Sequence, residues 1–237
     1  MGKSFFITGT GTDIGKTIST GFLYFVLNKL GIKTTVFKPF QTGLIEQTQT
    51  YPDLSWYESV MGVKDAGYYV FKPETSPHLA IKIQQAEVDV AAVLRRKEEL
   101  EQENDIVLIE GAGGLAVPLI ERKDGFYMTK DFIQAASVPA ILVSLSGLGS
   151  IHNVLTTYLY AQIHGISIRS FIFNKFENDS AIHQDNIHTI EKMIALPNFT
   201  LPSFKNVEQD LDDYAKHCIR AASFKEKIGE VFLRDTI

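Results

Sequence analysis

Gly9-Thr10-Gly11-Thr12-Asp13-Ile14-Gly15-Lys16-Thr17 is the segment from which we predict the fold. It follows an apolar run, Phe5-Phe6-Ile7, and precedes an amphipathic stretch over residues 18–30, so it lies where a buried strand turns into a helix. A glycine-rich turn in this setting is typical of a phosphate-binding loop. Backbone N–H groups and the helix N-terminus would bind a phosphate. Lys16 would reach the phosphate oxygens, and the Thr17 hydroxyl would bind Mg²⁺.

The loop is one residue longer than the common form. In that form a glycine stands five residues before the last glycine, but here this position is Thr10 and the glycine is Gly9. Many nucleotide-binding proteins have a phosphate-binding loop, so the loop alone predicts only that the chain binds a nucleoside triphosphate.

The composition favours small ligands as partners. The formal net charge of −5 and the lack of a basic run argue against binding to nucleic acid. The single cysteine, Cys218, excludes a disulfide framework within the chain and fits a reducing cytoplasm. The apolar run near the N-terminus is too short for a signal peptide, and no stretch approaches the roughly 20 apolar residues that span a bilayer. We therefore expect a cytoplasmic protein that binds no membrane.

Predicted strands and helices alternate along the chain. At 237 residues, one α/β domain over residues 1–237 is the simplest interpretation. Alternation of this kind predicts a three-layer, P-loop NTPase-like domain with a mainly parallel central sheet and helices on both faces. The expected strands lie at residues 5–7, 34–37, 106–109, 139–145 and 169–173, and the expected helices at 18–30, 88–104, 150–164 and 181–195. Residues 67–80 have no clear period and are expected to be irregular.

Charged residues stand at the ends of two predicted strands. Because ligands of open α/β sheets bind at the carboxyl ends of the strands, Lys38 and Glu110 are candidates for the site. An ordinary solvated lysine is the alternative for Lys38, whereas packing does not explain Glu110, whose carboxylate suits a nucleotide-bound Mg²⁺. Asp53 either caps a short helix or is another Mg²⁺ ligand. Thr42, in a predicted turn after the second strand, is a further candidate contact.

The ends of three later strands add further candidates. Gly111, Gly113 and Gly114 follow Glu110 and let the backbone approach a ligand closely. The turn from Gly147 to Asn153 opens a helix and either holds a carboxylate or is a plain capped turn. Asn174 either hydrogen-bonds a nucleobase or only turns the chain.

Several segments, taken in order, resemble dethiobiotin synthetases, the cytosolic enzymes of biotin synthesis. The matching segments are Thr8-Gly9-Thr10 with Gly15-Lys16-Thr17, Lys38-Pro39, Thr75-Ser76-Pro77-His78, Glu110-Gly111-Ala112-Gly113-Gly114, Pro118-Leu119, Leu148-Gly149-Ser150-Ile151 and Asn174. The loop length combined with the Glu-Gly-Ala-Gly-Gly segment is far more specific than a phosphate loop alone. The resemblance implies a ligase that uses ATP and Mg²⁺ to close a ureido ring on 7,8-diaminononanoate with CO₂, through a carbamate and a carbamic-phosphoric anhydride, and that forms a homodimer.

The resemblance also implies a role for individual residues. Lys16 and Lys38 would neutralise developing negative charge, with Thr12 and Thr42 beside the carbamate, and these four are the expected catalytic residues. Mg²⁺ would be held by Thr17, Asp53 and Glu110. The expected nucleotide contacts are Asp13, Ile14, Gly15, Lys16, Thr17, Ile18, Asn174 and Lys175. The expected substrate contacts are Thr12, Lys38, Thr42 and Gly113, together with Gly149, Ser150, Ile151, His152 and Asn153, which would bind the substrate carboxylate across the dimer interface.

Four departures from the family pattern leave details open. Gly147 replaces a lysine before the Leu-Gly turn, and His152-Asn153 reverses the usual Asn-His, so the carboxylate contacts are less firmly indicated. Asn174-Lys175 replaces Asn-Asp, and residues 198–204 depart from the usual segment near the base. Asn174-Lys175-Phe176-Glu177 loosely resembles the guanine-reading element of GTPases. The nucleotide is therefore ATP or another nucleoside triphosphate.

Two other classes of protein share parts of the pattern. Nucleotide-switch ATPases of the partitioning or division-site type have a similar sheet, but they carry an extra lysine near the start of the loop, and residues 9–14 contain none. A small-molecule kinase would also bind a nucleoside triphosphate, but it would leave the phosphate on its product.

Overall fold

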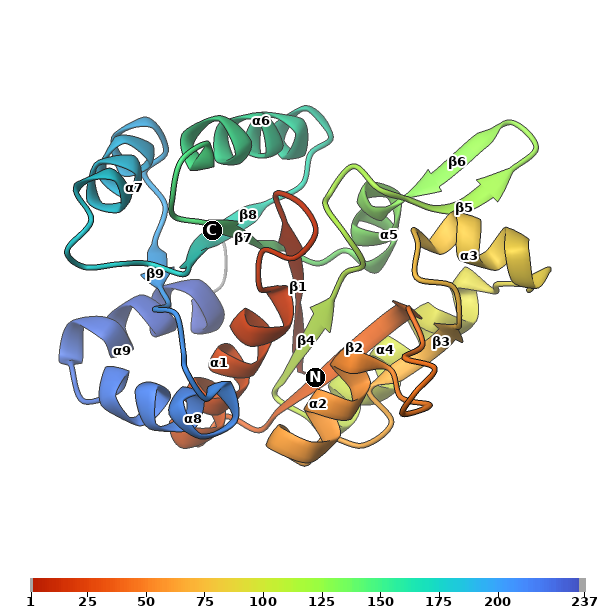
Figure 1. The fold of residues 1–237 in the computed structure, drawn as a ribbon, viewed down its shortest axis with the longest axis horizontal. Coiled ribbons are helices and arrows are strands. Elements are labelled where there is room, and N and C mark those ends of the chain that lie inside the picture. Colours follow the sequence, from red (N-terminus) through yellow and green to blue (C-terminus); the bar gives the residue numbers. More distant parts are fainter. Residues whose placement is uncertain (1, 235–237) are drawn as a thin grey trace.

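The computed structural model describes residues 2–234 and contains a parallel sheet of seven strands (Figure 1). The strand order is β3-β2-β4-β1-β7-β8-β9, and every neighbouring pair is parallel. The strands are β1 (Lys3–Gly9), β2 (Thr34–Thr42), β3 (Gly67–Phe71), β4 (Ile106–Glu110), β7 (Ala140–Leu145), β8 (Ile168–Asn174) and β9 (Asn198–Thr200). The parallel central sheet predicted from the alternation of elements is confirmed.

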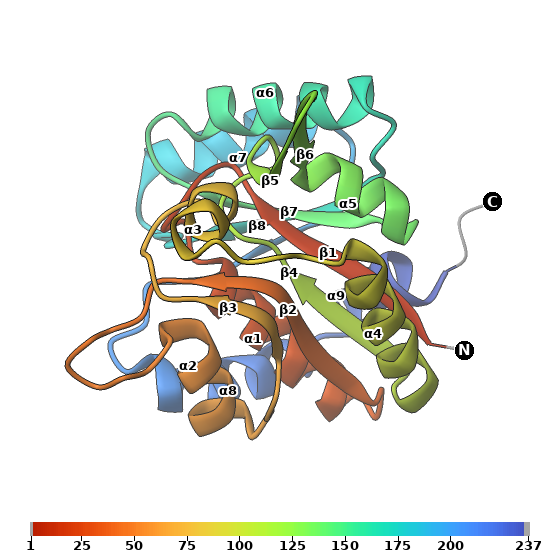
Figure 2. The ribbon, with the colours of Figure 1, turned by 90° about the vertical axis from the view of Figure 1, so that its right-hand side faces the viewer.

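Helices cover both faces of this sheet and give the molecule three layers (Figures 1 and 2). One face carries α1 (Lys16–Lys29), α2 (Pro52–Met61), α8 (Val207–Cys218), α9 (Ala222–Ile228) and a π-helical turn, η1 (Gly229–Leu233). The other face carries α3 (Pro77–Gln84), α4 (Val90–Glu103), α5 (Thr129–Ala136), α6 (Ser150–Ile163) and α7 (Ala181–Met193). The prediction of helices on both faces is confirmed.

The central strands contain apolar runs because both of their faces are buried. In β1, Phe6 packs into the core beneath α4 to α7, whereas Phe5 and Ile7 pack into the core beneath α1 and α8. In β4, Val107 and Leu108 divide between the two cores in the same way. A strand that contributes to two cores needs an unbroken apolar run, which explains the pattern in the sequence.

A short antiparallel hairpin lies outside the main sheet. It consists of β5 (Pro118–Arg122) and β6 (Gly125–Met128) and stands beside α3 (Figure 1). An ion pair joins Lys82 Nζ to Glu121 Oε2 at 2.9 Å, and the His78 ring contacts the Phe126 ring edge-on. The hairpin and α5, which follows it, were not expected from the sequence.

Two expectations about the first half of the chain were wrong. The second strand does not close at Lys38-Pro39 but continues to Thr42, so Lys38 lies inside β2 and Thr42 is its last residue rather than part of a turn. The reason is β3, which occupies part of the segment expected to be irregular and pairs with β2 from Lys38↔Gly67 to Thr42↔Phe71. Pairing with an edge strand of this kind extends β2 beyond its apolar run.

All seven parallel strands point the same way, so their carboxyl ends meet at one edge of the sheet. Gly9, Thr42, Glu110, Leu145 and Asn174 are the last residues of β1, β2, β4, β7 and β8. The phosphate-binding loop opens from this edge, between β1 and α1 (Figure 1). Within residues 2–234, no helix has the length and apolar character needed to cross a membrane.

Candidate functional site

The phosphate-binding loop connects β1 to α1 through two left-handed residues, Asp13 (φ 57°) and Gly15 (φ 90°). A side chain at position 15 would meet Asn174, because a Cβ atom there would lie 1.8 Å from Asn174 Nδ2. Only glycine combines the positive φ with this close approach. Lys16 begins α1 and folds back over the loop, where its Nζ donates to the Gly11 carbonyl at 3.2 Å.

The start of α1 is suited to bind an anion. The first N–H groups of a helix have no carbonyl acceptor within the helix, and the helix dipole adds partial positive charge at the same place. Gly15, Lys16, Thr17 and Ile18 supply this end of α1, and the Lys16 ammonium lies beside them. Together these groups can bind phosphate oxygens.

Lys38, Asp53 and Glu110 converge on Thr17, although they come from β2, α2 and β4. The Thr17 hydroxyl lies 2.9 Å from Asp53 Oδ1 and 3.1 Å from Glu110 Oε1. Lys38 Nζ lies 2.6 Å from Glu110 Oε1 and 2.5 Å from Asp53 Oδ2. The structure thus brings the three predicted metal ligands together and places a cation between the two carboxylates.

Burial and charge oppose each other in this cluster. Burial alone lowers the pKa of Lys38, but the Glu110 and Asp53 carboxylates more than offset it, so the pKa of Lys38 is raised. Burial alone raises the pKa of Asp53, but the Lys38 ammonium and hydrogen bonds from Lys38 and Thr17 bring that pKa below its ordinary value. Both groups therefore stay charged at neutral pH. Burial lowers the pKa of Lys16.

The oxygens beside Thr17 suit a hard divalent cation. They are two carboxylates and one hydroxyl, which is the type of donor that Mg²⁺ prefers. Among the residues that the structure describes, no three His, Cys, Asp or Glu side chains come together to hold a metal. A Mg²⁺ ion here would complete its shell with phosphate oxygens and water, as is usual for nucleotide-bound Mg²⁺.

The other predicted substrate residues of the first half lie on loops at the same edge of the sheet. Thr12 is exposed in the phosphate-binding loop, and Thr42 is half-buried at the end of β2. Gly113 has a φ of 72° in the loop after β4. Next to it, a Cβ on Gly114 would lie 3.2 Å from the Gly9 carbonyl oxygen, so this loop packs against the start of the phosphate loop. Contact of these residues with a substrate remains a prediction.

The predicted carboxylate turn leads into α6. Gly149 precedes the helix with a φ of 88°, Ser150 is buried, and Ile151 is half-buried, whereas His152 and Asn153 are exposed. Asn186 of α7 holds this turn, because its Nδ2 donates to the carbonyls of Ser146 at 3.0 Å and Gly147 at 2.8 Å. The helix was predicted from the sequence, but this contact was not. Binding of a carboxylate at this turn remains a prediction.

Asn174 is engaged with the phosphate loop itself. Its side chain is buried, and its Nδ2 donates to the Ile14 carbonyl at 3.0 Å. The next residue, Lys175, is exposed and left-handed, with a φ of 55°. The amide therefore supports the loop, and the reading of a nucleobase by Asn174 and Lys175 remains a prediction.

Sequence reasoning missed two residues that contact Glu110. The hydroxyls of Tyr57 and Thr20 both donate to Glu110 Oε2, the carboxylate oxygen that does not face Thr17. The only sequence signal is spacing: Tyr57 follows Asp53 by four residues, so the two share one face of α2. The spacing does not indicate that this face meets β4.

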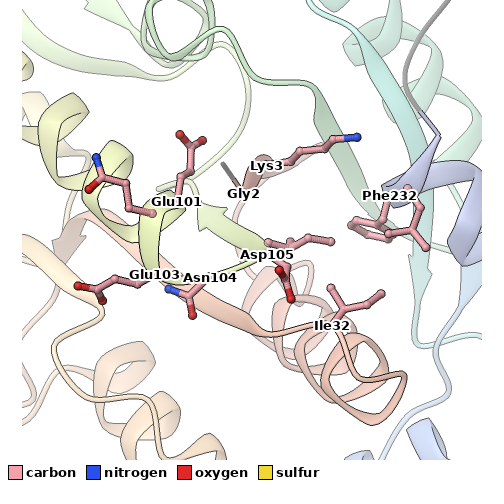
Figure 3. Close-up of a pocket in the computed structure, with 11 residues that line it drawn as sticks. Gly2, Lys3, Ile32, Glu101, Glu103, Asn104, Asp105 and Phe232 are labelled. Atoms are coloured by element: carbon pink, nitrogen blue, oxygen red, sulfur yellow. The ribbon is translucent and has the colours of Figure 1, made fainter.

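A separate hollow lies at the opposite edge of the sheet, where β1 and β4 begin (Figure 3). Its lining includes Lys3, Glu101, Asp105 and Phe232. The phosphate loop and the Lys38–Asp53–Glu110 cluster lie at the other ends of these strands. The hollow is therefore not part of the candidate site.

Comparisons with known proteins agree on the family and the fold. Residues 3–208 match the model of the family described as AAA domain. The ATP-dependent dethiobiotin synthetase BioD of Geobacillus sp. (strain WCH70) is 51% identical over 209 residues, which cover 87% of each chain.

Two solved structures resemble the chain at low sequence identity. Cobyrinic acid a,c-diamide synthase from Mycobacterium smegmatis, with bound ADP and magnesium, has a TM-score of 0.56 at 14% identity and full coverage of both chains. The ParA protein of pNOB8, bound to nonspecific DNA, has a TM-score of 0.58 at 15% identity, covering 98% of this chain and 97% of ParA. At this identity the two structures show only that the fold is shared.

Proposed function

The chain belongs to the family of ATP-dependent dethiobiotin synthetases, and we propose that it closes a ureido ring on 7,8-diaminononanoate with CO₂ in a Mg²⁺-dependent reaction. The family makes the chain an ATP-dependent cyclo-ligase of dethiobiotin synthesis. The diamine, the carbamate route and Mg²⁺ are the proposed details. The observation that carries them is the convergence of Lys38, Asp53 and Glu110 on Thr17, directly beside the phosphate loop.

The proposed chemistry has three steps. One amine of the substrate adds to CO₂ and loses a proton, which gives a carbamate. A carbamate oxygen then attacks the γ-phosphorus, the bond to the bridging oxygen breaks, and ADP leaves with that electron pair. Finally the second amine attacks the carbamate carbon, phosphate leaves, and the nitrogen loses a proton as the ring closes.

The lysines of the site would stabilise the charge that develops in these steps. The phosphate loop and Lys16 would hold the transferred phosphate, for which positioning and neutralisation matter more than covalent help from the protein. Lys38 is buried and flanked by carboxylates, so it is held in one place and does not need to be reoriented during the reaction. Thr12 and Thr42 would orient the carbamate by hydrogen bonds.

Thr17, Asp53 and Glu110 would hold the metal. When bound, Mg²⁺ supplies positive charge to the phosphate oxygens of the nucleotide. The donor set supports this proposal, because two carboxylates and a hydroxyl leave positions for phosphate oxygens and water.

The remaining substrate contacts and the assembly follow from the family resemblance. We propose that Gly113 contacts the substrate and that residues 149–153 bind the substrate carboxylate across a homodimer interface. We also propose that the enzyme works in the cytoplasm and has no nucleic-acid or membrane partners. Exposed apolar side chains on one side of α6 and just before it support a dimer. Leu148 is 95% exposed, Leu159 54% and Ile163 78%.

We expect Asp13, Ile14 and the start of α1 to bind the triphosphate, while Asn174 and Lys175 lie toward the base. The hydrogen bond from Asn174 to Ile14 supports a link between the base side and the loop. ATP is the family's nucleotide, and we propose that this chain discriminates between ATP and other nucleoside triphosphates less strongly than the family pattern implies, so that ATP and GTP are turned over at similar rates. Turnover rates with ATP and GTP measure this preference directly.

Phosphate release distinguishes the proposed reaction from its alternatives. With ATP and Mg²⁺ present, free phosphate should appear only when the diamine and bicarbonate are both added. A nucleotide-switch ATPase would hydrolyse ATP without the diamine, and a kinase would retain the phosphate on its product. Phosphate release that is independent of the diamine would contradict the proposal.

A further inference from the structure

Glu110 uses its two carboxylate oxygens differently. The side chain is almost fully buried, at 1% exposure. Oε1 faces Thr17 and Lys38, at 3.1 and 2.6 Å. Oε2 faces the interior and accepts from Thr20 and Tyr57. The interior oxygen therefore fixes the orientation of the carboxylate, and the other oxygen is presented to the site.

Thr20 cannot hold the interior oxygen alone. Its hydroxyl has one proton but lies 2.9 Å from Glu110 Oε2 and also 2.9 Å from the Lys16 carbonyl oxygen. A hydroxyl donates one hydrogen bond at a time, so part of its donation goes to the helix backbone. The Tyr57 hydroxyl is the second donor, and it reaches Oε2 from a different helix, α2.

Tyr57 also fixes the position of the other carboxylate. Asp53 and Tyr57 lie four residues apart, so both side chains leave the same face of α2 one turn apart. Asp53 contacts Thr17 and Lys38, while Tyr57 contacts Glu110. The hydrogen bond from Tyr57 thus attaches α2 to the end of β4 and sets the position of Asp53 relative to Glu110.

We propose that Tyr57 is a positioning residue of the metal site. Its hydroxyl orients Glu110 and, through α2, Asp53, so that their outward oxygens and the Thr17 hydroxyl can bind one divalent cation together. This inference rests on the proposed function, because it assumes that Thr17, Asp53 and Glu110 hold the metal. Residues that orient metal ligands typically change metal affinity by about 10- to 100-fold when removed.

The matched variants are Tyr57→Phe and Tyr24→Phe. Tyr57→Phe removes only the hydroxyl and keeps the fully buried ring in place. Tyr24→Phe also removes one tyrosine hydrogen bond to or from α2, because Tyr24 Oη of α1 donates to the Met61 carbonyl at 3.1 Å, at the far end of α2. Both variants lose one hydrogen bond from α1 or α2, but only the first one touches Glu110.

Binding of Mn²⁺ to the full chain, in the presence of a non-hydrolysable ATP analogue, is measured from the electron paramagnetic resonance signal of free Mn²⁺. Tyr57→Phe should raise the dissociation constant by about tenfold, whereas Tyr24→Phe should leave it within twofold of wild type. Thr20→Val should weaken binding in the same direction, which provides a second variant if Tyr57→Phe does not fold. Thermal unfolding of each variant shows whether the fold is retained.

Glu110→Gln separates this inference from the metal site itself. If Glu110→Gln binds Mn²⁺ as tightly as wild type, the proposed metal site is wrong and the role of Tyr57 with it. If Glu110→Gln loses binding but folded Tyr57→Phe and Thr20→Val both bind Mn²⁺ like wild type, only the positioning role of Tyr57 is overturned.

Discussion

Lys38 balances the charge of the site. It lies within 2.6 Å of both carboxylates and is buried with Glu110, whereas Asp53 is half-buried, so its ammonium compensates the cost of taking these carboxylates partly or fully out of water. Lys16 adds a second cation, whose Nζ donates to the Gly11 carbonyl within the phosphate loop. Each of these charges has a partner at a defined distance, so the effects of removing one can be predicted.

Lys16→Gln tests the role of the loop lysine. The substitution removes the positive charge from the loop but keeps a polar side chain, so we expect the rate of phosphate release to fall by about three orders of magnitude. The thermal unfolding midpoint should stay close to that of wild type. Lys64→Gln, at an exposed position outside the site, is the control and should keep full activity. A Lys16→Gln enzyme with a tenth of the wild-type rate would show that this lysine does not stabilise the transferred phosphate.

Asp53→Asn tests the charge balance through the pH dependence of stability. The pKa of Asp53 is below its ordinary value of 3.8, since Lys38 and Thr17 favour the ionised form. A carboxyl group whose pKa is lower in the folded than in the unfolded protein stabilises the fold at pH values above its unfolded pKa. This stabilisation is lost as the pH falls through the folded pKa. We therefore expect a larger free energy of unfolding for wild type than for Asp53→Asn at pH 7. This difference in the free energy of unfolding should shrink below about pH 4.

Urea unfolding at a series of pH values measures this difference. Glu58→Gln removes an exposed carboxylate from the same helix and serves as the control, because Glu58 is in none of the described ion pairs of the site. A difference between wild type and Asp53→Asn that stays constant from pH 7 to pH 3 would show that Lys38 does not stabilise the Asp53 carboxylate.

At the level of elements, strand ends were the most predictable part of the site. The apolar runs of β1, β4, β7 and β8 were visible in the sequence because buried parallel strands need them. Parallel strands share one carboxyl edge, so Glu110 could be assigned to that edge before the structure was known, whereas Lys38 was assigned from a strand end that the structure places at Thr42 instead. Asp53 could be assigned only through the family resemblance, because an aspartate at the start of a helix is usually a cap.

Other elements could not be predicted because long-range packing determines them. The edge strand β3 is half-exposed and has no strong apolar period, and it forms by pairing with β2. The β5–β6 hairpin is short, is exposed over residues 121–126, and is anchored to α3 by contacts such as Lys82–Glu121. The contact between Tyr57 and Glu110 depends on how α2 packs against β4, which no local pattern encodes.

Asn174→Ala tests how the end of β8 supports the phosphate loop. Loss of the hydrogen bond to the Ile14 carbonyl should loosen the loop for every nucleotide, so the affinities for ATP and GTP should fall by a similar factor, about five- to tenfold. Calorimetric titration of both nucleotides measures this, with Asn178→Ala, at an exposed position nearby, as the control. A loss confined to ATP would show that Asn174 acts by reading the base instead.

For the whole molecule, the fold does not identify the reaction. The sheet and its helices are shared with ParA and with cobyrinic acid a,c-diamide synthase at 14 to 15% identity. The family is identified by the 51% identity to a dethiobiotin synthetase over most of the chain. The reaction itself is proposed from the family together with the residues beside the phosphate loop.

The transfer of carbon from bicarbonate to the product tests the proposed reaction most directly. The full chain is incubated with ATP, Mg²⁺, 7,8-diaminononanoate and ¹³C-bicarbonate, and the product mass and the free phosphate are measured in the same samples. We predict dethiobiotin that carries one ¹³C atom, formed in equal amount to the phosphate released. Phosphate release without ¹³C in a cyclic urea product would contradict the proposed reaction.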